Sequence, residues 1–137
     1  LKKFTLLDLS YNNLIGGIPT ELGSLTELAL LDVSYNKITL NIPTELGNLQ
    51  KLATLGLSNN RLSGEIPTEI GSLLQLAFLD MSSNYALSGH EFRFLRELTF
   101  LDLHVNDLRP IDISQLGNLK KLTYLHLGGN KIEYPIL

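Results

Sequence analysis

The sequence predicts an α/β repeat solenoid, a single domain in which short parallel strands stack on one side and loops and 3-10 turns return the chain. Three observations predict this fold. Aliphatic residues recur with a period of 24 residues, each period contains a short segment of alternating apolar and polar residues, and an Asn follows that segment. A chain with this pattern buries its leucines only when neighbouring repeats stack into one continuous core.

Six repeats cover the chain as one domain, residues 1–137. Within a repeat the apolar residues lie at fixed offsets, as in Leu25, Leu28, Leu31 and Val33, a spacing that no amphipathic helix produces. The middle of each repeat therefore predicts a strand, and the six strands predict a parallel sheet with neighbours about 4.8 Å apart. The repeats are 1–24, 25–48, 49–72, 73–94, 95–118 and 119–137.

The Asn after each predicted strand is interpreted as a structural residue. An inward amide at a bend can donate to backbone carbonyls and accept from backbone N–H groups that the turn leaves unpaired. The predicted Asn ladder comprises Asn12, Asn36, Asn60, Asn84, Asn106 and Asn130. At Gly23, Gly47, Gly71 and Gly117, which precede the next repeat, we expect a backbone with positive φ.

These residues resemble the plant-type leucine-rich repeat. The pattern Leu-x-x-Leu-x-x-Leu-x-Leu-Ser-x-Asn-x-Leu-Ser-Gly-x-Ile-Pro-x-x-Leu-Gly is nearly intact at 49–71. The resemblance implies a right-handed horseshoe with a concave parallel sheet and extra strand pairing beside the Gly-x-Ile-Pro segment. It also implies protein or ligand binding, as in receptor-like kinase ectodomains, receptor-like proteins and inhibitors of pathogen enzymes. Leu40 stands where the pattern has Gly. In the fifth repeat Pro110 and Asp112 replace the Gly and Ile of Gly-x-Ile-Pro, and the sixth repeat has Ile132-Glu133-Tyr134-Pro135 there, so we do not expect the extra strands after residue 90.

The cysteine-paired end caps of plant extracellular members are missing, so the chain is interpreted as an uncapped internal fragment. It contains no Cys, no Asn-x-Ser/Thr sequon, no signal peptide and no apolar run of membrane-spanning length. The resemblance suggests an extracellular or cell-surface location, but these features leave the compartment open. With 11 Lys and Arg against 14 Asp and Glu, the chain has no basic footprint for nucleic acid or an anionic membrane.

Side chains that point out of the predicted sheet form columns with one residue per repeat. One column runs from Leu6 through Leu30 and Thr54 to three aromatic residues, and an exposed aromatic stripe is typical of a binding site. The aromatic end is expected to be the main anchor, charged neighbours its polar rim, and two tyrosines a weaker anchor. The predicted protein-binding residues are Phe78, Phe100, Tyr124, Asp80, Asp102, His104, His126, Tyr11 and Tyr35.

Two other kinds of chemistry are considered and not favoured. Asp102, His104 and His126 are residue types that bind zinc or transfer protons, but an open sheet face offers no pocket and no nucleophile beside a base. We therefore expect no metal, cofactor or catalysis, and a contact between Asp102 and His126 instead. The recurrent Thr20, Thr44 and Thr68 could suggest an ice-binding face. Each is instead interpreted as the start of a helical turn, with its hydroxyl accepting a backbone N–H.

The sequence thus predicts a non-enzymatic module that binds a protein or peptide on its concave face. Two alternatives stay open. The chain could be an ectodomain fragment of a cell-surface receptor that acts in signalling or defence, or it could be a structural spacer or surface-array repeat.

Overall fold

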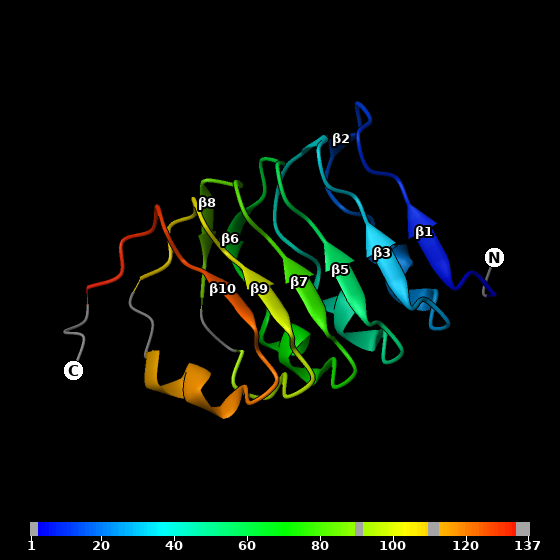
Figure 1. Cartoon of the computed structure of the whole chain (residues 1–137). Helices are drawn as coiled ribbons and strands as arrows, with labels where there is room; N and C mark the ends of the chain where they lie inside the picture. Colours follow the sequence, from blue (N-terminus) through cyan, green and yellow to red (C-terminus); the bar gives the residue numbers. More distant parts are fainter. Residues whose placement is uncertain (1–2, 90–91, 110–112, 134–137) are drawn as a thin grey trace.

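The computed structural model describes residues 3–89, 92–109 and 113–133, and it confirms the repeat solenoid. Six three-residue strands form one parallel sheet in which their order follows their order in the chain (Figure 1). Each repeat therefore adds one strand beside the previous one. The strands are β1 (Leu6–Asp8), β3 (Leu30–Asp32), β5 (Thr54–Gly56), β7 (Phe78–Asp80), β9 (Phe100–Asp102) and β10 (Tyr124–His126).

The register of this sheet has no slip from the first strand to the last. Leu6 pairs with Leu30, Leu30 with Thr54, and the same alignment continues to Tyr124. The predicted columns are thus confirmed as rows of equivalent residues across the sheet. The central residue of each strand points into the core, and in the four inner strands this leucine is fully buried.

Four 3-10 helices return the chain between strands in the described residues. They are η1 (Thr20–Ser24), η2 (Thr44–Asn48), η3 (Thr68–Ser72) and η4 (Ile113–Asn118). The threonines do begin helical turns, but the predicted cap by their hydroxyls is wrong, because a proline with extended backbone holds the cap position and no side chain caps the turn. The Thr20 hydroxyl lies instead 3.4 Å from the carboxylate of Glu21.

Short strands pair on a second side of the solenoid, as the resemblance implied. They are β2 (Ile15–Gly16) with β4 (Lys37–Ile38), and β6 (Ser63–Glu65) with β8 (Ala86–Ser88), both parallel. Leu40 occupies the position of Gly16 and Gly64 and keeps their left-handed backbone, with φ of 67° against 79° and 81°. After Ser88, the described residues contain no further strand of this kind, and Pro110 and Asp112, on which the expectation for the fifth repeat rests, lie outside the described residues.

The core between the two sides is almost entirely aliphatic, and Phe92 is the largest side chain in it. The closing glycines have a different role from the predicted one, because none of Gly23, Gly47, Gly71 or Gly117 has positive φ. A Cβ on Gly23 would lie 2.4 Å from the carbonyl oxygen of Glu45, and one on Gly47 would lie 2.7 Å from the Cβ of Glu69. Glycine is therefore required at these two positions because the next repeat packs directly against it.

None of the helices within the described ranges is long and apolar enough to cross a membrane.

Candidate functional site

The Asn ladder holds the turns at the ends of the six main strands. The Asn60 amide nitrogen donates to the carbonyls of Val33, Leu57 and Ser58 at 3.0, 3.3 and 3.2 Å, and its oxygen accepts from the Ile38 N–H at 3.0 Å. From Asn36 onward, each ladder amide thus links its own turn to the preceding repeat. Asn60, Asn84 and Asn106 are buried, Asn36 and Asn130 are half-buried, and Asn12 at the end is exposed.

The residue before each ladder Asn has a left-handed backbone, which the sequence analysis did not predict. The φ values are 54–56° for the five residues that carry side chains and 68° for Gly129. Asn and Gly, which adopt this conformation most easily, occupy two of the six positions and were the available signal. The positions are Tyr11, Tyr35, Asn59, Ser83, Val105 and Gly129.

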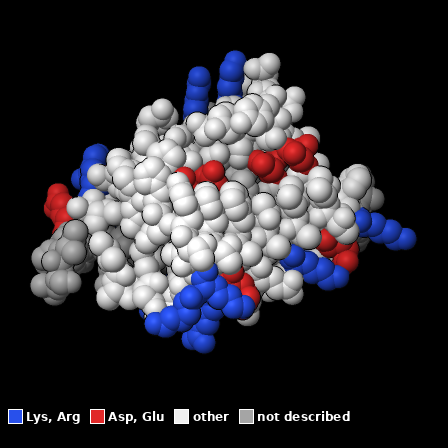
Figure 2. All heavy atoms as spheres, in the orientation of Figure 1, with Lys and Arg blue, Asp and Glu red and all other residues white. Residues whose placement is uncertain are grey.

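The side chains that point out of the main sheet make up the surface called here the sheet face. It is the face turned toward the viewer in Figures 1 and 2. Acidic atoms gather in two groups in the middle of this face, whereas most Lys and Arg side chains lie at its borders (Figure 2). The middle of the sheet face is therefore apolar and acidic.

Three aromatic rings stack on the sheet face and form the strip called here the aromatic strip, Phe78, Phe100 and Tyr124. The Phe78 and Phe100 ring centroids are 4.3 Å apart with planes at 12°, and those of Phe100 and Tyr124 are 4.3 Å apart at 3°. The unbroken register of β7, β9 and β10 produces this stack. Phe78 and Phe100 are half-buried and Tyr124 is exposed, so the strip presents one rigid apolar ribbon.

The two N-terminal tyrosines stack as well. The ring centroids of Tyr11 and Tyr35 lie 4.2 Å apart with planes at 8°. Hydrogen bonding to Tyr35 raises the pKa of Tyr11, and partial desolvation adds to the effect. The pair is more exposed than the aromatic strip, with Tyr11 73% and Tyr35 45% exposed.

The carboxylates beside the aromatic strip bind the turn that follows their own strand. Asp80 Oδ1 accepts from the N–H and the hydroxyl of Ser82 at 3.0 and 2.7 Å. Asp102 Oδ1 accepts from the His104 N–H at 3.0 Å and lies 2.6 Å from His104 Nδ1. Each carboxylate therefore both shapes the turn and carries negative charge on the sheet face.

Asp102 and His126 make the expected contact, at a distance longer than a hydrogen bond. His126 Nδ1 lies 3.7 Å from Asp102 Oδ1, because that oxygen already serves the turn and the imidazole of His104. The two imidazoles stack with centroids 4.3 Å apart and planes at 17°. Burial, together with the negative charge of Asp102, raises the pKa of Tyr124, whose ring stands edge-on to His126.

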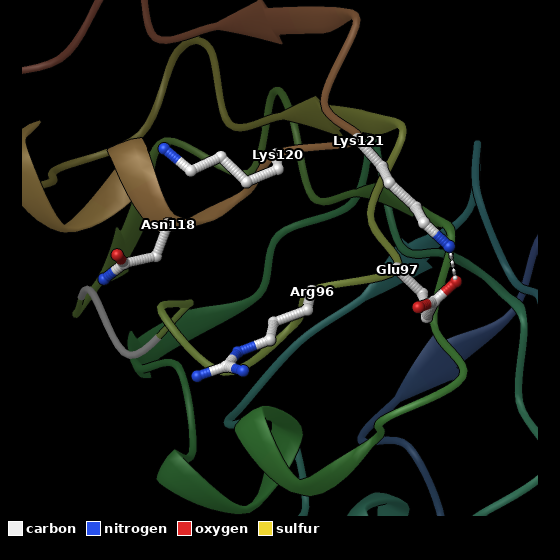
Figure 3. A pocket seen from close by; sticks show the side chains of 5 residues that line it. All are labelled: Arg96, Glu97, Asn118, Lys120 and Lys121. Atoms are coloured by element: carbon white, nitrogen blue, oxygen red, sulfur yellow. Dashed lines mark hydrogen bonds and ion pairs between the residues drawn. The ribbon is translucent and has the colours of Figure 1, made fainter.

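A second feature, which the sequence analysis missed, is a basic hollow of about 440 Å³ in the loops that precede β9 and β10. Figure 3 shows its lining, in which Lys121 Nζ binds Glu97 Oε2 at 2.6 Å. Lys51 Nζ and Glu27 Oε2, which like Lys121 and Glu97 are 24 residues apart, make an equivalent contact at 2.7 Å. The signal available in the sequence was a Lys one repeat after a Glu. The lining residues are Arg96, Glu97, Asn118, Lys120 and Lys121.

Taken together, a parallel sheet with one Asn-bound turn per strand and a 3-10 return defines a leucine-rich repeat solenoid. The family model described as Leucine Rich Repeat matches residues 3–25, 27–49 and 51–73, which is half of the chain. This chain belongs to the leucine-rich repeat family. No curated protein sequence matches it.

Solved structures of plant receptors are similar to the whole described fold. The ectodomain of the Arabidopsis thaliana membrane receptor kinase GASSHO1/SCHENGEN3, in complex with CASPARIAN STRIP INTEGRITY FACTOR 2, is 34% identical with a TM-score of 0.91, covering 96% of this chain and 16% of that one. The plant peptide hormone receptor RGFR1, in complex with RGF2, is 37% identical with a TM-score of 0.92, covering 96% and 22%.

The same architecture occurs in a bacterium. A leucine-rich repeat protein of Leptospira interrogans is 34% identical with a TM-score of 0.86, and the match covers 96% of this chain and 33% of that one. The chain thus spans between about a sixth and a third of the length of these three structures.

Proposed function

We propose that this chain is a non-enzymatic module that binds a peptide or protein on its sheet face, the concave side expected for the family. The observation that carries the proposal is the stacked aromatic strip. Rings already fixed by packing lose little conformational freedom on binding, and exposed Phe and Tyr are frequent hot spots of interfaces. Two matched receptors, GASSHO1/SCHENGEN3 and RGFR1, were solved in complex with their ligands, which supports a binding role.

The polar neighbours of the strip would orient the ligand. Asp80 and Asp102 lie one column away from the rings, on the same strands, and His104 and His126 continue the polar edge. Because the middle of the sheet face is acidic, a ligand that pairs apolar side chains with basic groups or N–H donors fits it best. Tyr11 and Tyr35 offer a second, more exposed anchor at the N-terminal half of the same face.

We also propose that the module works within a larger receptor ectodomain at the cell surface. Support comes from the plant receptors among the matched structures. This chain spans only 16% of the GASSHO1/SCHENGEN3 ectodomain and 22% of RGFR1. Signalling or defence would then be the role of the whole receptor, and ligand selection the role of this segment.

The test is a selection of peptides from a random display library on the folded chain, followed by titration calorimetry of the best binder. Phe100→Ala removes the middle ring of the strip, and we expect it to weaken binding by about 30-fold or more, equivalent to about 2 kcal/mol. Phe94→Ala is the matched control, because Phe94 is an exposed ring, 50% accessible, that is not part of the strip. The control should leave the affinity unchanged.

Circular dichroism of each variant checks that the fold is retained. Equal affinity in wild type, Phe78→Ala, Phe100→Ala and Tyr124→Ala would rule out the strip and move the search to Tyr11 and Tyr35. Failure to select any peptide that binds the folded chain would favour the spacer alternative.

A further inference from the structure

We propose that Asp102, His104 and His126 form a binding site for a divalent transition metal, with Zn²⁺ as the reference ion. The three side chains come from two adjacent repeats, at the ends of β9 and β10. Each offers one ligand atom, and the three atoms all lie within 4.8 Å of one another. Imidazole nitrogen and carboxylate oxygen are the donors that Zn²⁺ accepts alongside thiolate.

One of the two donor separations from Asp102 is close to the value that one ion imposes, and the other must widen. Two ligands bound at about 2.1 Å in a tetrahedral arrangement lie roughly 3.4 Å apart. His126 Nδ1 is 3.7 Å from Asp102 Oδ1, which is near that value. His104 Nδ1 is closer, at 2.6 Å, because a hydrogen bond joins it to the carboxylate. An ion would replace the shared proton, which leaves to solvent, and a small rotation of the imidazole would open the gap.

The surroundings hold the carboxylate donor in place before any ion arrives. Asp102 is 6% exposed, and its Oδ1 is fixed by the His104 N–H. The His126 ring stacks on the His104 ring in a nearly parallel plane, and Tyr124 contacts it edge-on, with centroids 6.4 Å apart and planes at 88°. Because a metal ion lies in the plane of each imidazole that binds it, one of the two exposed rings must turn out of the stack when the ion binds. The carboxylate is therefore fixed before the ion arrives, which favours metal binding because the entropy of ordering it is lost during folding. The imidazoles supply the movement that the site needs.

Gly128 completes this arrangement. A Cβ at that position would lie 3.0 Å from His126 Nε2, so any larger residue would press on the ring. The absence of a side chain at residue 128 thus leaves room for His126 to turn its Nδ1 toward Asp102.

The site is accessible to an ion from solution. The side chains of His104 and His126 are 30% and 46% exposed. Three protein ligands leave one position of a tetrahedral ion open, and water or a side chain of a bound partner can fill it. The acidic middle of the sheet face also raises the local concentration of cations.

The experiment titrates ZnCl₂ into the metal-free chain at neutral pH by calorimetry and repeats the titration with Co²⁺, whose visible absorption reports its coordination geometry. We expect saturable binding of one ion per chain. His104→Gln and His126→Gln should each weaken binding at least tenfold. Two controls should bind as wild type does: Asp80→Asn, the equivalent carboxylate one strand earlier, and His90→Gln, the remaining histidine of the chain.

Circular dichroism again checks the folding of each variant, and His126→Gln is the decisive one because this exposed side chain adds little to the core. The proposal is overturned if wild type shows no saturable binding, or if His126→Gln binds as tightly as wild type. Weakening by His90→Gln but not by His104→Gln would likewise place the ion elsewhere.

Discussion

Single side chains at the strand ends carry much of the stability of this solenoid, and Asn60 shows how. Its amide makes four hydrogen bonds to backbone groups of two turns, in a site that is 4% exposed. Asn60→Ala would leave those buried groups without partners. We expect a loss of about 1 to 3 kcal/mol in the free energy of unfolding, measured by urea denaturation.

Asn12→Ala is the matched control for that change. Asn12 occupies the same position in the first repeat but is exposed, so water can replace its two bonds to carbonyls. The control should lose less than about 0.5 kcal/mol. Equal losses in both variants would contradict the role of burial in the ladder.

Backbone strain at Leu40 is a second effect of one residue. Leu40 has φ of 67° where the equivalent residues are glycines, and its side chain is 65% exposed. A left-handed backbone costs a non-glycine residue about 1 to 2 kcal/mol, more than the roughly 0.5 to 1 kcal/mol of extra chain entropy that glycine loses on folding. We therefore expect Leu40→Gly to stabilise the chain by about 0.5 to 1 kcal/mol in thermal or urea unfolding.

Leu74→Gly tests whether this gain is specific to the backbone at Leu40. Leu74 is similarly exposed, at 60%, but does not have positive φ. Leu74→Gly should therefore destabilise the folded chain, because glycine loses more conformational freedom on folding than leucine does. A loss of stability in Leu40→Gly as well would show that the strain is smaller than the entropic cost.

Among the structural elements, the 3-10 helices set how closely consecutive repeats approach. Gly47 in η2 packs against Glu69 near the start of η3. A Cβ added to Gly47 would lie 2.7 Å from the Cβ of Glu69. Gly47→Ala should force the helices apart and cost about 1 to 3 kcal/mol, read as a lower midpoint in urea. Gly117→Ala is the control, because an added Cβ there meets no atom within 4 Å. Similar midpoints for both variants would contradict tight packing of the helices.

The period of the sequence was enough to predict the strands of the main sheet and the columns of side chains across it, because the spacing of the buried leucines allows only one register. It was not enough for contacts that depend on side-chain rotation. The position of His126 beside Asp102 was predicted from the columns, yet the carboxylate turns toward His104, two residues along its own chain. The closing glycines were misinterpreted for a related reason: close packing and positive φ both require glycine, and the sequence pattern is the same.

At the scale of the whole molecule, the two ends of the stack differ from its middle. The inward leucines of the inner strands are fully buried, whereas Leu125 in the last strand is 42% exposed. At the other end, a cavity of about 200 Å³ opens among apolar side chains that include Leu9, Ile18 and Leu22. A repeat protein with open ends gains stability when further repeats cover them.

We expect polar capping repeats, fused before Leu1 and after Leu137, to raise the melting temperature and the solubility of this chain. Differential scanning calorimetry and sedimentation at several concentrations would measure both. The cause is burial of the apolar surface at the two ends of the core. A capped and an uncapped chain with the same melting temperature, both monomeric, would contradict the view that these ends limit stability.

Because the register of the main sheet has no slip, equivalent side chains recur at a constant spacing across the strands. A bound segment that crosses the strands must match this spacing. The strands repeat about every 4.8 Å. A polyproline II segment turns the same side outward every third residue, about 9.3 Å along its axis, which nearly equals two strand spacings. Such a segment would therefore place residues i and i+3 over Phe78 and Tyr124, with Phe100 between them. The residues within each column change from repeat to repeat, so a ligand shifted by one strand spacing would contact different side chains. The sheet would therefore select a ligand with a three-residue period and would bind it in a single alignment.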